Sequence, residues 1–175
     1  MSVTSAPRRA GIEYVDVQTA AELAAACEER FPACDLLLMA AAVADYRPAE
    51  PHAGKLKKDE TGEELPLRLV RTTDVLSTLA AGRAPGQILV GFAAEHGDAV
   101  LAHARDKLAR KGLDAVVVND VSTPGIAFDA PDNEVTVVAA DAERHIPRAS
   151  KAEVASSILD AVLSRRSSTN IKVPR

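Results

Sequence analysis

Residues 12–39 read IEYVDVQTAAELAAACEERFPACDLLLM, and the order of patterns in this stretch predicts the fold class. Residues 12–17 are short, apolar and β-prone, so we expect a strand there. Thr19 followed by Glu22 has the capping-box spacing that begins a helix. Residues 36–39 are an unbroken apolar run, typical of a strand that is buried on both faces. Strand, helix and strand in this order indicate an α/β protein with a parallel sheet.

The same alternation resumes after residue 72. We expect a short helix capped by residues 72–74, strands near 87–92, 114–118 and 134–139, a helix ending at Gly112, and a last helix from the Ser150–Glu153 capping box. That last helix carries an apolar stripe of Val154, Ile158, Leu159 and Val162.

The middle of the chain has a different pattern. Residues 55–58 and 65–69 flank residues 59–62 (Asp-Glu-Thr-Gly), which predicts an antiparallel hairpin. The predicted fold class is therefore α/β, a Rossmann-like three-layer arrangement around a mostly parallel sheet with an inserted antiparallel hairpin. We expect one domain over 12–165, an irregular N-terminus over 1–11 and a disordered tail over 166–175.

Composition excludes several classes of protein. Of the 175 residues, 47% are hydrophobic and 26% are charged, which is ordinary for a globular protein and unlike a disordered chain. The net charge of −4 argues against general nucleic-acid binding. The longest apolar run, 36–44, is too short for the roughly 20 residues that span a bilayer. With no signal-peptide pattern, and with Cys27 and Cys34 interpreted as buried thiols, we expect a cytoplasmic protein without membrane contact.

Candidate ligand-binding residues follow the predicted strands. In open α/β sheets ligands bind beyond the carboxyl ends of the strands, where residues 40–47, 91–95 and 119–121 fall. The small residues that open the first segment leave backbone N–H groups accessible to phosphate or carbonyl oxygens. Asp45 and Arg47 follow them, and a local ion pair is an equal alternative for these two side chains.

Basic and aromatic side chains near these segments have two interpretations each. Residues 55–58 contain three lysines, which protect a strand edge or let Lys55 reach a triphosphate. Lys107 and Lys111 share a helix face that is either solvated or phosphate-binding. Phe92 stacks on a base or packs in the core. The histidines do not have metal-ligand spacing, and the sequence contains no P-loop. A nicotinamide-dependent reductase fits the α/β alternation, but the sequence lacks the G-x-G-x-x-G pattern, so this is a third and weaker hypothesis.

Five sequence motifs, in this order and spacing, closely resemble the phosphopantothenoylcysteine synthetase family. They are residues 41–48 (AAVADYRP), 55–58 (KLKK), 91–95 (GFAAE), 104–107 (ARDK) with Lys111, and 118–121 (VNDV). The resemblance covers residues 12 to about 163. In many bacteria this unit is the C-terminal half of a bifunctional protein whose other half is a flavin-dependent decarboxylase.

The resemblance implies a set of binding residues and a reaction. The family's bacterial form uses CTP and Mg²⁺ to activate the carboxylate of 4'-phosphopantothenate as an acyl-cytidylate, which cysteine then attacks. Lys55 is the implied catalytic residue, and Ala41, Ala42 and Asp45 are the implied substrate contacts. Family members form homodimers, and the basic hairpin is the implied contact region. The implied CTP contacts are Met39, Ala40, Ala41, Asp45, Lys55, Thr73, Asp74, Val75, Leu76, Phe92, Lys107 and Lys111.

One part of the family pattern has no counterpart here. The family places a strand, a glycine-containing turn and an Asn with a Ser-Ser-Gly segment ahead of the part that corresponds to residue 12. A decarboxylase partner or a separate N-terminal segment is thus an expected partner, and a catalytically incomplete nucleotide-binding fragment is the alternative function. A sheet without that central strand exposes two unpaired edges, which predicts aggregation or partner dependence.

Overall fold

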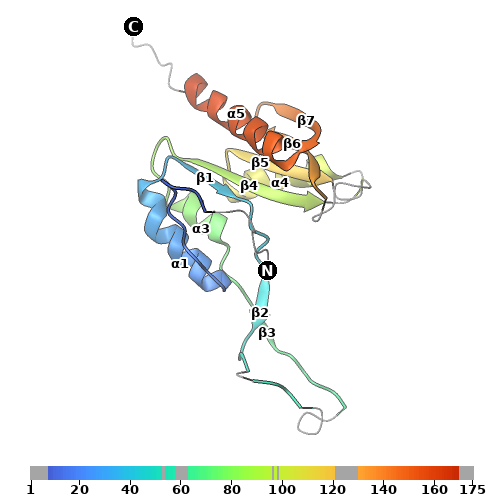
Figure 1. Cartoon of the computed structure of the whole chain (residues 1–175). Helices are drawn as coiled ribbons and strands as arrows, with labels where there is room; N and C mark the ends of the chain where they lie inside the picture. Colours follow the sequence, from blue (N-terminus) through green and yellow to red (C-terminus); the bar gives the residue numbers. More distant parts are fainter. Residues whose placement is uncertain are drawn as a thin grey trace. The chain divides into compact units, whose positions relative to one another are not determined.

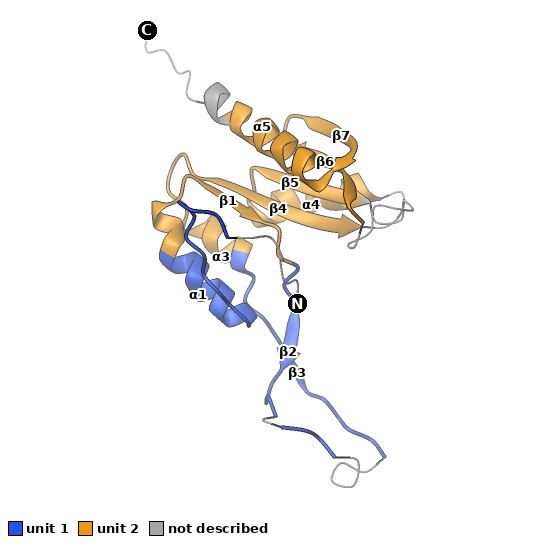
Figure 2. Ribbon diagram, viewed as in Figure 1, with its two compact units in different colours: residues 1–29, 42–75 blue, residues 30–41, 76–175 orange. Residues whose placement is uncertain are grey.

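The computed structural model describes residues 8–52, 54–57, 63–95, 97, 99–120 and 130–169, except for the side chains of Asp120 and residues 166–169. The chain divides into two compact units (Figure 2). The smaller unit comprises residues 1–29 and 42–75, and the larger comprises residues 30–41 and 76–175. No described helix is long and apolar enough to cross a membrane.

The larger unit is built on a five-stranded sheet with the order β1-β4-β5-β6-β7 (Figure 1). β1 pairs with β4 and β4 with β5 in parallel, whereas β6 is antiparallel to both of its neighbours. Four strands therefore point one way and β6 alone points the other, which confirms the mostly parallel sheet. The strands are β1 (Leu36–Met39), β4 (Ile88–Glu95), β5 (Ala115–Asp120), β6 (Asp132–Ala139) and β7 (Glu143–Ser150).

Helices cover both faces of this sheet, as the three-layer prediction requires. On one face Val154, Ile158 and Val162 of α5 pack against alternate residues of β4, β5 and β6, and all three are at most 6% exposed. Leu159 was predicted on this stripe, but it is 37% exposed, because Ala161 rather than Leu159 faces the sheet. The helices are α3 (Val75–Ala81), α4 (Val100–Lys111) and α5 (Lys151–Thr169).

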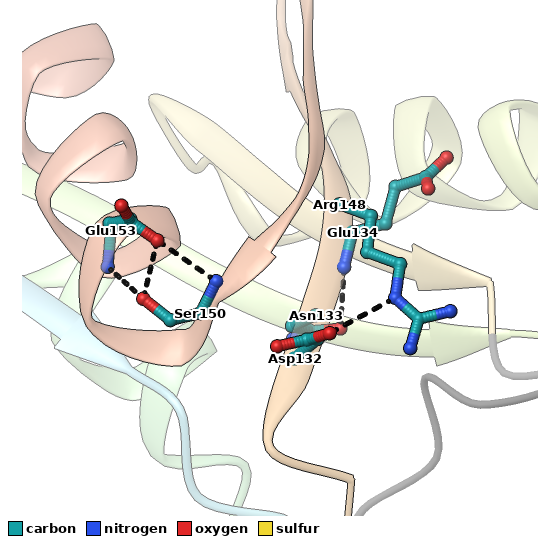
Figure 3. Close-up of polar contacts among 6 residues, drawn as sticks. All are labelled: Asp132, Asn133, Glu134, Arg148, Ser150 and Glu153. Carbon is teal, nitrogen blue, oxygen red and sulfur yellow. Dashed lines mark hydrogen bonds and ion pairs between the residues drawn. The ribbon is translucent and has the colours of Figure 1, made fainter.

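Both predicted helix ends of the larger unit carry the expected signals. Gly112 ends α4 in the left-handed conformation (φ 63°, ψ 39°), which glycine adopts without steric cost. At the start of α5, the Ser150 N–H donates to Glu153 Oε2 at 3.1 Å and the Glu153 N–H donates to Ser150 Oγ at 3.3 Å (Figure 3). α5 continues to Thr169, into the segment expected to be a disordered tail; residues 170–175 lie outside the described residues.

β7 was not predicted, and its pairing with β6 contains an irregularity. The register is interrupted between Asn133 and Val135, close to Pro147, which has no N–H for the ladder. Asn133 Oδ1 accepts the Glu134 N–H at 2.9 Å, and Arg148 pairs with Asp132 at 3.2 Å (Figure 3). The charged residues and the proline of β7 hid it from a search for apolar alternation.

The smaller unit contains a helix and a two-stranded ribbon. α1 (Ala20–Arg30) has the predicted capping box: the Glu22 N–H donates to Thr19 Oγ1 at 3.1 Å. β2 (Tyr46–Pro48) pairs antiparallel with β3 (Leu69–Arg71). The antiparallel pairing of the hairpin is thus confirmed, but its strands lie further from the turn than predicted, and residues 58–62 lie outside the described part.

The predicted strand over 12–17 is wrong, because this segment joins no described sheet. Ile12 is 54% exposed, and local contacts hold the segment instead: Arg8 pairs with Asp16 at 2.5 Å and the Arg9 N–H donates to the Tyr14 hydroxyl at 2.9 Å. β1 consequently has β4 as its single partner among the described strands. Its sequence, Leu-Leu-Leu-Met, has none of the charges or prolines that protect an edge.

The capping box of α5 makes stability depend on pH. The Ser150 hydroxyl and N–H both donate to the Glu153 carboxylate, and these bonds lower its pKa. The stabilisation is therefore complete above the unfolded-state pKa of about 4.3 and is lost as pH falls through the folded-state pKa. We expect Glu153→Gln to lower the free energy of unfolding more at pH 7 than at pH 3, as measured by urea denaturation. Asp160→Asn, on the same helix away from its N-terminus, is the control; an equal loss at both pH values would contradict the prediction.

Candidate functional site

The residues singled out in the sequence divide between the two units. The exposure of these residues shows which of them could contact a ligand through the side chain and which only through the backbone. Met39, Val75 and Leu76 are at most 8% exposed, so they can offer a ligand little more than their backbone. The larger unit holds Met39, Ala40, Ala41, Leu76, Phe92, Lys107 and Lys111, and the smaller holds Ala42, Asp45, Lys55, Thr73, Asp74 and Val75.

Lys107 places a positive charge beside the second half of β4. Its Nζ donates to the Phe92 carbonyl oxygen at 2.6 Å, and the side chain is half-buried. Lys107 lies one helical turn before Lys111, the last residue of α4 and also half-buried. Because the ammonium is anchored at a strand backbone, it keeps a defined position toward the carboxyl end of the sheet, where anionic ligands bind in folds of this class.

Gly91 explains how a lysine stem can lie so close to the strand. A Cβ added at Gly91 would lie 2.9 Å from Leu113 Cδ1, 3.2 Å from Leu76 Cδ1 and 3.8 Å from Lys107 Cε. Gly91 also stands opposite Met39 in the β1–β4 register. Several predicted residues therefore lie close to Gly91. They are Met39 and the exposed Ala40 at the end of β1, Leu76, Phe92 and Lys107.

The ring of Phe92 lies on the other face of the sheet. It is half-buried and packs with Leu36 and Leu38 against the cluster formed with α5. Core packing was one of the two interpretations of this residue, and the ring takes part in it. The part of Phe92 that meets Lys107 is its backbone carbonyl.

In the smaller unit, Asp45 and Lys55 both have exposed side chains. The Thr72 N–H donates to the Asp45 carbonyl at 2.9 Å, and the Thr72 hydroxyl donates to the Ala44 carbonyl at 2.5 Å. These bonds fix the backbone where the ribbon begins. Within the described residues Asp45 and Arg47 form no ion pair, and Arg47 Nη1 donates instead to the Pro48 carbonyl at 3.2 Å. The Asp45 carboxylate is thus accessible to a ligand.

Asn119 lies in the strand-end segment 119–121 predicted from the sequence, but it was not among the individual residues predicted to contact a ligand. Its Oδ1 is buried and has no hydrogen-bond partner in the described structure. Asn119 lies at the carboxyl end of β5, opposite Ala94 of β4. A buried acceptor without a donor calls for an explanation, and a donor from a ligand at this edge of the sheet would satisfy it. Its position in the Val118–Asn119 strand end was the available signal, but residue type alone gave no reason to prefer it.

The described residues include no group of three or more His, Cys, Asp or Glu side chains placed to hold a metal ion. The described residues therefore contain no complete ligand set for a metal held by the protein alone. Mg²⁺ usually keeps several waters and binds substrate phosphates with one or two carboxylates, so it does not need such a set.

Residues 1–165 match the family described as DNA/pantothenate metabolism flavoprotein, C-terminal domain. The chain belongs to this family. A relative from Mycobacterium tuberculosis, the coenzyme A biosynthesis bifunctional protein CoaBC, is 45% identical over 163 residues, covering 88% of this chain and 38% of the relative. The CoaBC of Bacillus subtilis is 40% identical over 151 residues, covering 86% and 36%. The chain thus spans well under half the length of these relatives.

A solved structure supports the same membership in this flavoprotein-domain family. The crystal structure of the C-terminal domain of a CoaBC protein superposes with a TM-score of 0.72 at 31% sequence identity. The superposition covers 93% of this chain and 72% of that domain.

The close approach at Gly91 can be tested by substitution. We expect Gly91→Ala to lower the free energy of unfolding by about 1–3 kcal/mol, because the new methyl group overlaps Leu113 and Leu76. Gly82→Ala is the matched control, since a Cβ there meets nothing within 4 Å. Urea denaturation of both variants measures the difference. Equal stability of the two variants would show that the side chains of Leu113 and Leu76 can shift without cost.

Proposed function

We propose that this chain is the phosphopantothenate–cysteine ligase part of coenzyme A biosynthesis, a CTP-dependent acid–amino-acid ligase. The observation that carries the proposal is the family match over residues 1–165, together with relatives named as bifunctional coenzyme A biosynthesis proteins. The anchored Lys107 and the accessible carboxylate of Asp45 give the proposal a chemical basis within each unit.

The proposed nucleotide site uses the carboxyl end of the sheet. Lys107 and Lys111 would face phosphate oxygens, and the backbone of Met39, Ala40 and Ala41 would line the approach. Residues 73–76, which lead into α3, would add backbone N–H groups, because Val75 and Leu76 are too buried to contribute side chains. We add Asn119, whose unsatisfied oxygen would accept a hydrogen bond from the nucleotide.

The proposed reaction has two steps. A carboxylate oxygen of 4'-phosphopantothenate attacks the α-phosphorus of CTP, and the bond to the β-phosphate breaks with release of pyrophosphate. The amine of cysteine then attacks the acyl carbon, loses a proton and expels CMP. Charge builds on the phosphate oxygens in the first step, so the Lys55 ammonium would stabilise that transition state. Ala41, Ala42 and Asp45 would orient the phosphopantothenate, and Mg²⁺ would enter with CTP and offset its charge.

We also propose a homodimer that uses the hairpin of the smaller unit (described residues 46–52, 54–57 and 63–71), which we call the arm. The arm exposes Leu65, Leu67 and Leu69 by 55%, 63% and 49%. These leucines alternate along the chain, so an extended arm would present them on one face. Such an apolar stripe suits contact with a second copy. The relatives are named as bifunctional proteins, and the sequence resemblance implies a decarboxylase as the other half. We therefore propose a decarboxylase, fused or separate, as a further partner, and a cytoplasmic location.

A second candidate is a nucleotide-binding chain that needs a partner segment for turnover. One observation favours it: β1 is an apolar strand with a single partner in the described sheet. The Gly- and Asn-containing segment expected from the family resemblance would be that partner segment.

Pyrophosphate release separates the two candidates. We expect the purified chain with 4'-phosphopantothenate, cysteine and Mg²⁺ to release pyrophosphate with CTP and more slowly with ATP. Release has to depend on phosphopantothenate. If CTP raises the melting temperature but no pyrophosphate forms, the second candidate is correct. If the chain neither turns over nor binds CTP, both proposals fail.

The role of Lys55 has its own test. We expect Lys55→Ala to lower kcat by about 10²–10³ with a smaller change in the KM for CTP, because the charge acts mainly in the transition state. Lys57→Ala, two residues along the same exposed segment, is the control and should retain most of the activity. Equal losses in the two variants would mean that the segment contributes only general positive charge.

A further inference from the structure

A cavity of about 700 Å³ lies in the larger unit at the amino ends of β4 and β5. This is the edge of the sheet opposite the Phe92 carbonyl and Asn119, so it shares no residue with the proposed nucleotide site. Its size is within the range of pockets that hold small metabolites. It is formed by the α3–β4 turn (residues 83–88), residues 113–115, Ala140 between β6 and β7, and Val162 and Arg165 of α5.

Hydrogen bonds hold the wall of this cavity in shape. Asp114 Oδ2 accepts the Leu89 N–H at 2.8 Å and Arg83 Nη1 at 2.6 Å, so one carboxylate joins the start of β4 to the turn. The Gln87 carboxamide accepts the Ala84 N–H at 2.8 Å and donates to the carbonyls of Phe31 and Cys34. The turn is thus fixed at both ends by buried or half-buried partners, and the cavity is preformed.

Two guanidinium groups from separate elements border the cavity. The side chains of Arg83 and Arg165 are each 34% exposed, and each is oriented by an aspartate, Asp114 and Asp141. Arg165 lowers the pKa of Asp141, which keeps that partner ionised. The ion pair with Asp114 occupies Nη1 of Arg83, and a guanidinium has five N–H donors in all. The lining residues carry two positive charges and one negative charge, in a chain whose net charge is −4.

The remaining wall is apolar. Val162 is 1% exposed and Leu113 is 8% exposed, and both line the cavity together with Ile88 and Pro85. A cavity that combines apolar walls with a few convergent polar groups is the usual form of a small-molecule site. We propose that this cavity is a second ligand site, which binds a small molecule with an apolar body and one anionic head group held by Arg83 and Arg165.

The experiment uses three probes with the same ring and different heads. Phenylacetate, phenyl phosphate and 2-phenylethanol are titrated into the full chain, and the backbone amide signals of Gly86, Leu113 and Ala115 are followed by NMR. We expect the Kd obtained from these shifts to be at least about tenfold lower for an anionic probe than for the alcohol. Whichever anion has the lower Kd identifies the preferred head group as carboxylate or phosphate. Absence of shifts at these amides, or equal binding of the alcohol, would overturn the proposal.

Variants tie the binding to the two arginines. Arg83→Gln and Arg165→Gln should each weaken the preferred anion by about tenfold, whereas Arg110→Gln on the exposed face of α4 should bind as the unaltered chain does. Ala140→Trp, at an exposed position of the lining, should block binding without removing a charge. Unchanged binding in all three lining variants, with folding confirmed by circular dichroism, would refute the assignment. The result is independent of the ligase proposal, because no residue of the cavity takes part in that reaction.

Discussion

The larger unit depends on the need to bury β4 on both faces. Leu89 and Val90 are 0% exposed, and they point to opposite sides of the sheet. α5 has to cover one side and α3 with α4 the other, and the chain meets this need with Ala, Val and Leu, since it has few aromatic residues and no tryptophan. At Gly91 the helix side approaches so closely that no side chain fits without displacement. The same closeness brings the Lys107 ammonium to the strand backbone, so the packing of the core and the charge of the candidate site have one cause.

The two ends of β4 carry different kinds of polar group. At its start, the Leu89 N–H is bound by Asp114, which also holds Arg83. Toward its end, the Phe92 carbonyl is bound by Lys107, and the Asn119 oxygen on the neighbouring strand has no hydrogen-bond partner among the described residues. Near each end of β4, a backbone group that forms no hydrogen bond with a neighbouring strand is therefore bound by a charged side chain. Lys107 in turn borders the proposed nucleotide site, and Asp114 lines the cavity that we propose as a second ligand site.

Much of this arrangement could be predicted from the sequence, because its signals are local. Several features are determined by a few neighbouring residues. They are the Thr19–Glu22 and Ser150–Glu153 capping boxes, the left-handed Gly112 and the apolar run of β1. Features that depend on distant partners could not be predicted in the same way. Residues 12–17 have strand-like composition but no strand in the described sheet to pair with, and β7 is a strand despite its charges because β6 lies beside it. The same distinction holds for the candidate site. The strand ends could be located from the sequence, but the burial of the Asn119 oxygen and the core packing of the Phe92 ring depend on residues that are distant in the sequence.

The β1–β4 pairing also has a consequence for how the chain folds. β5, β6 and β7 follow one another along the chain and pair with their sequence neighbours, so their contacts close short loops. Leu36 instead pairs with Ile88, and the whole of residues 42–75 has to be enclosed by that contact. Loop-closure entropy makes this the most expensive contact of the sheet to form early. We therefore expect β1 to be the last strand to join the sheet, which would leave both β1 and the open side of β4 exposed to other chains until it does.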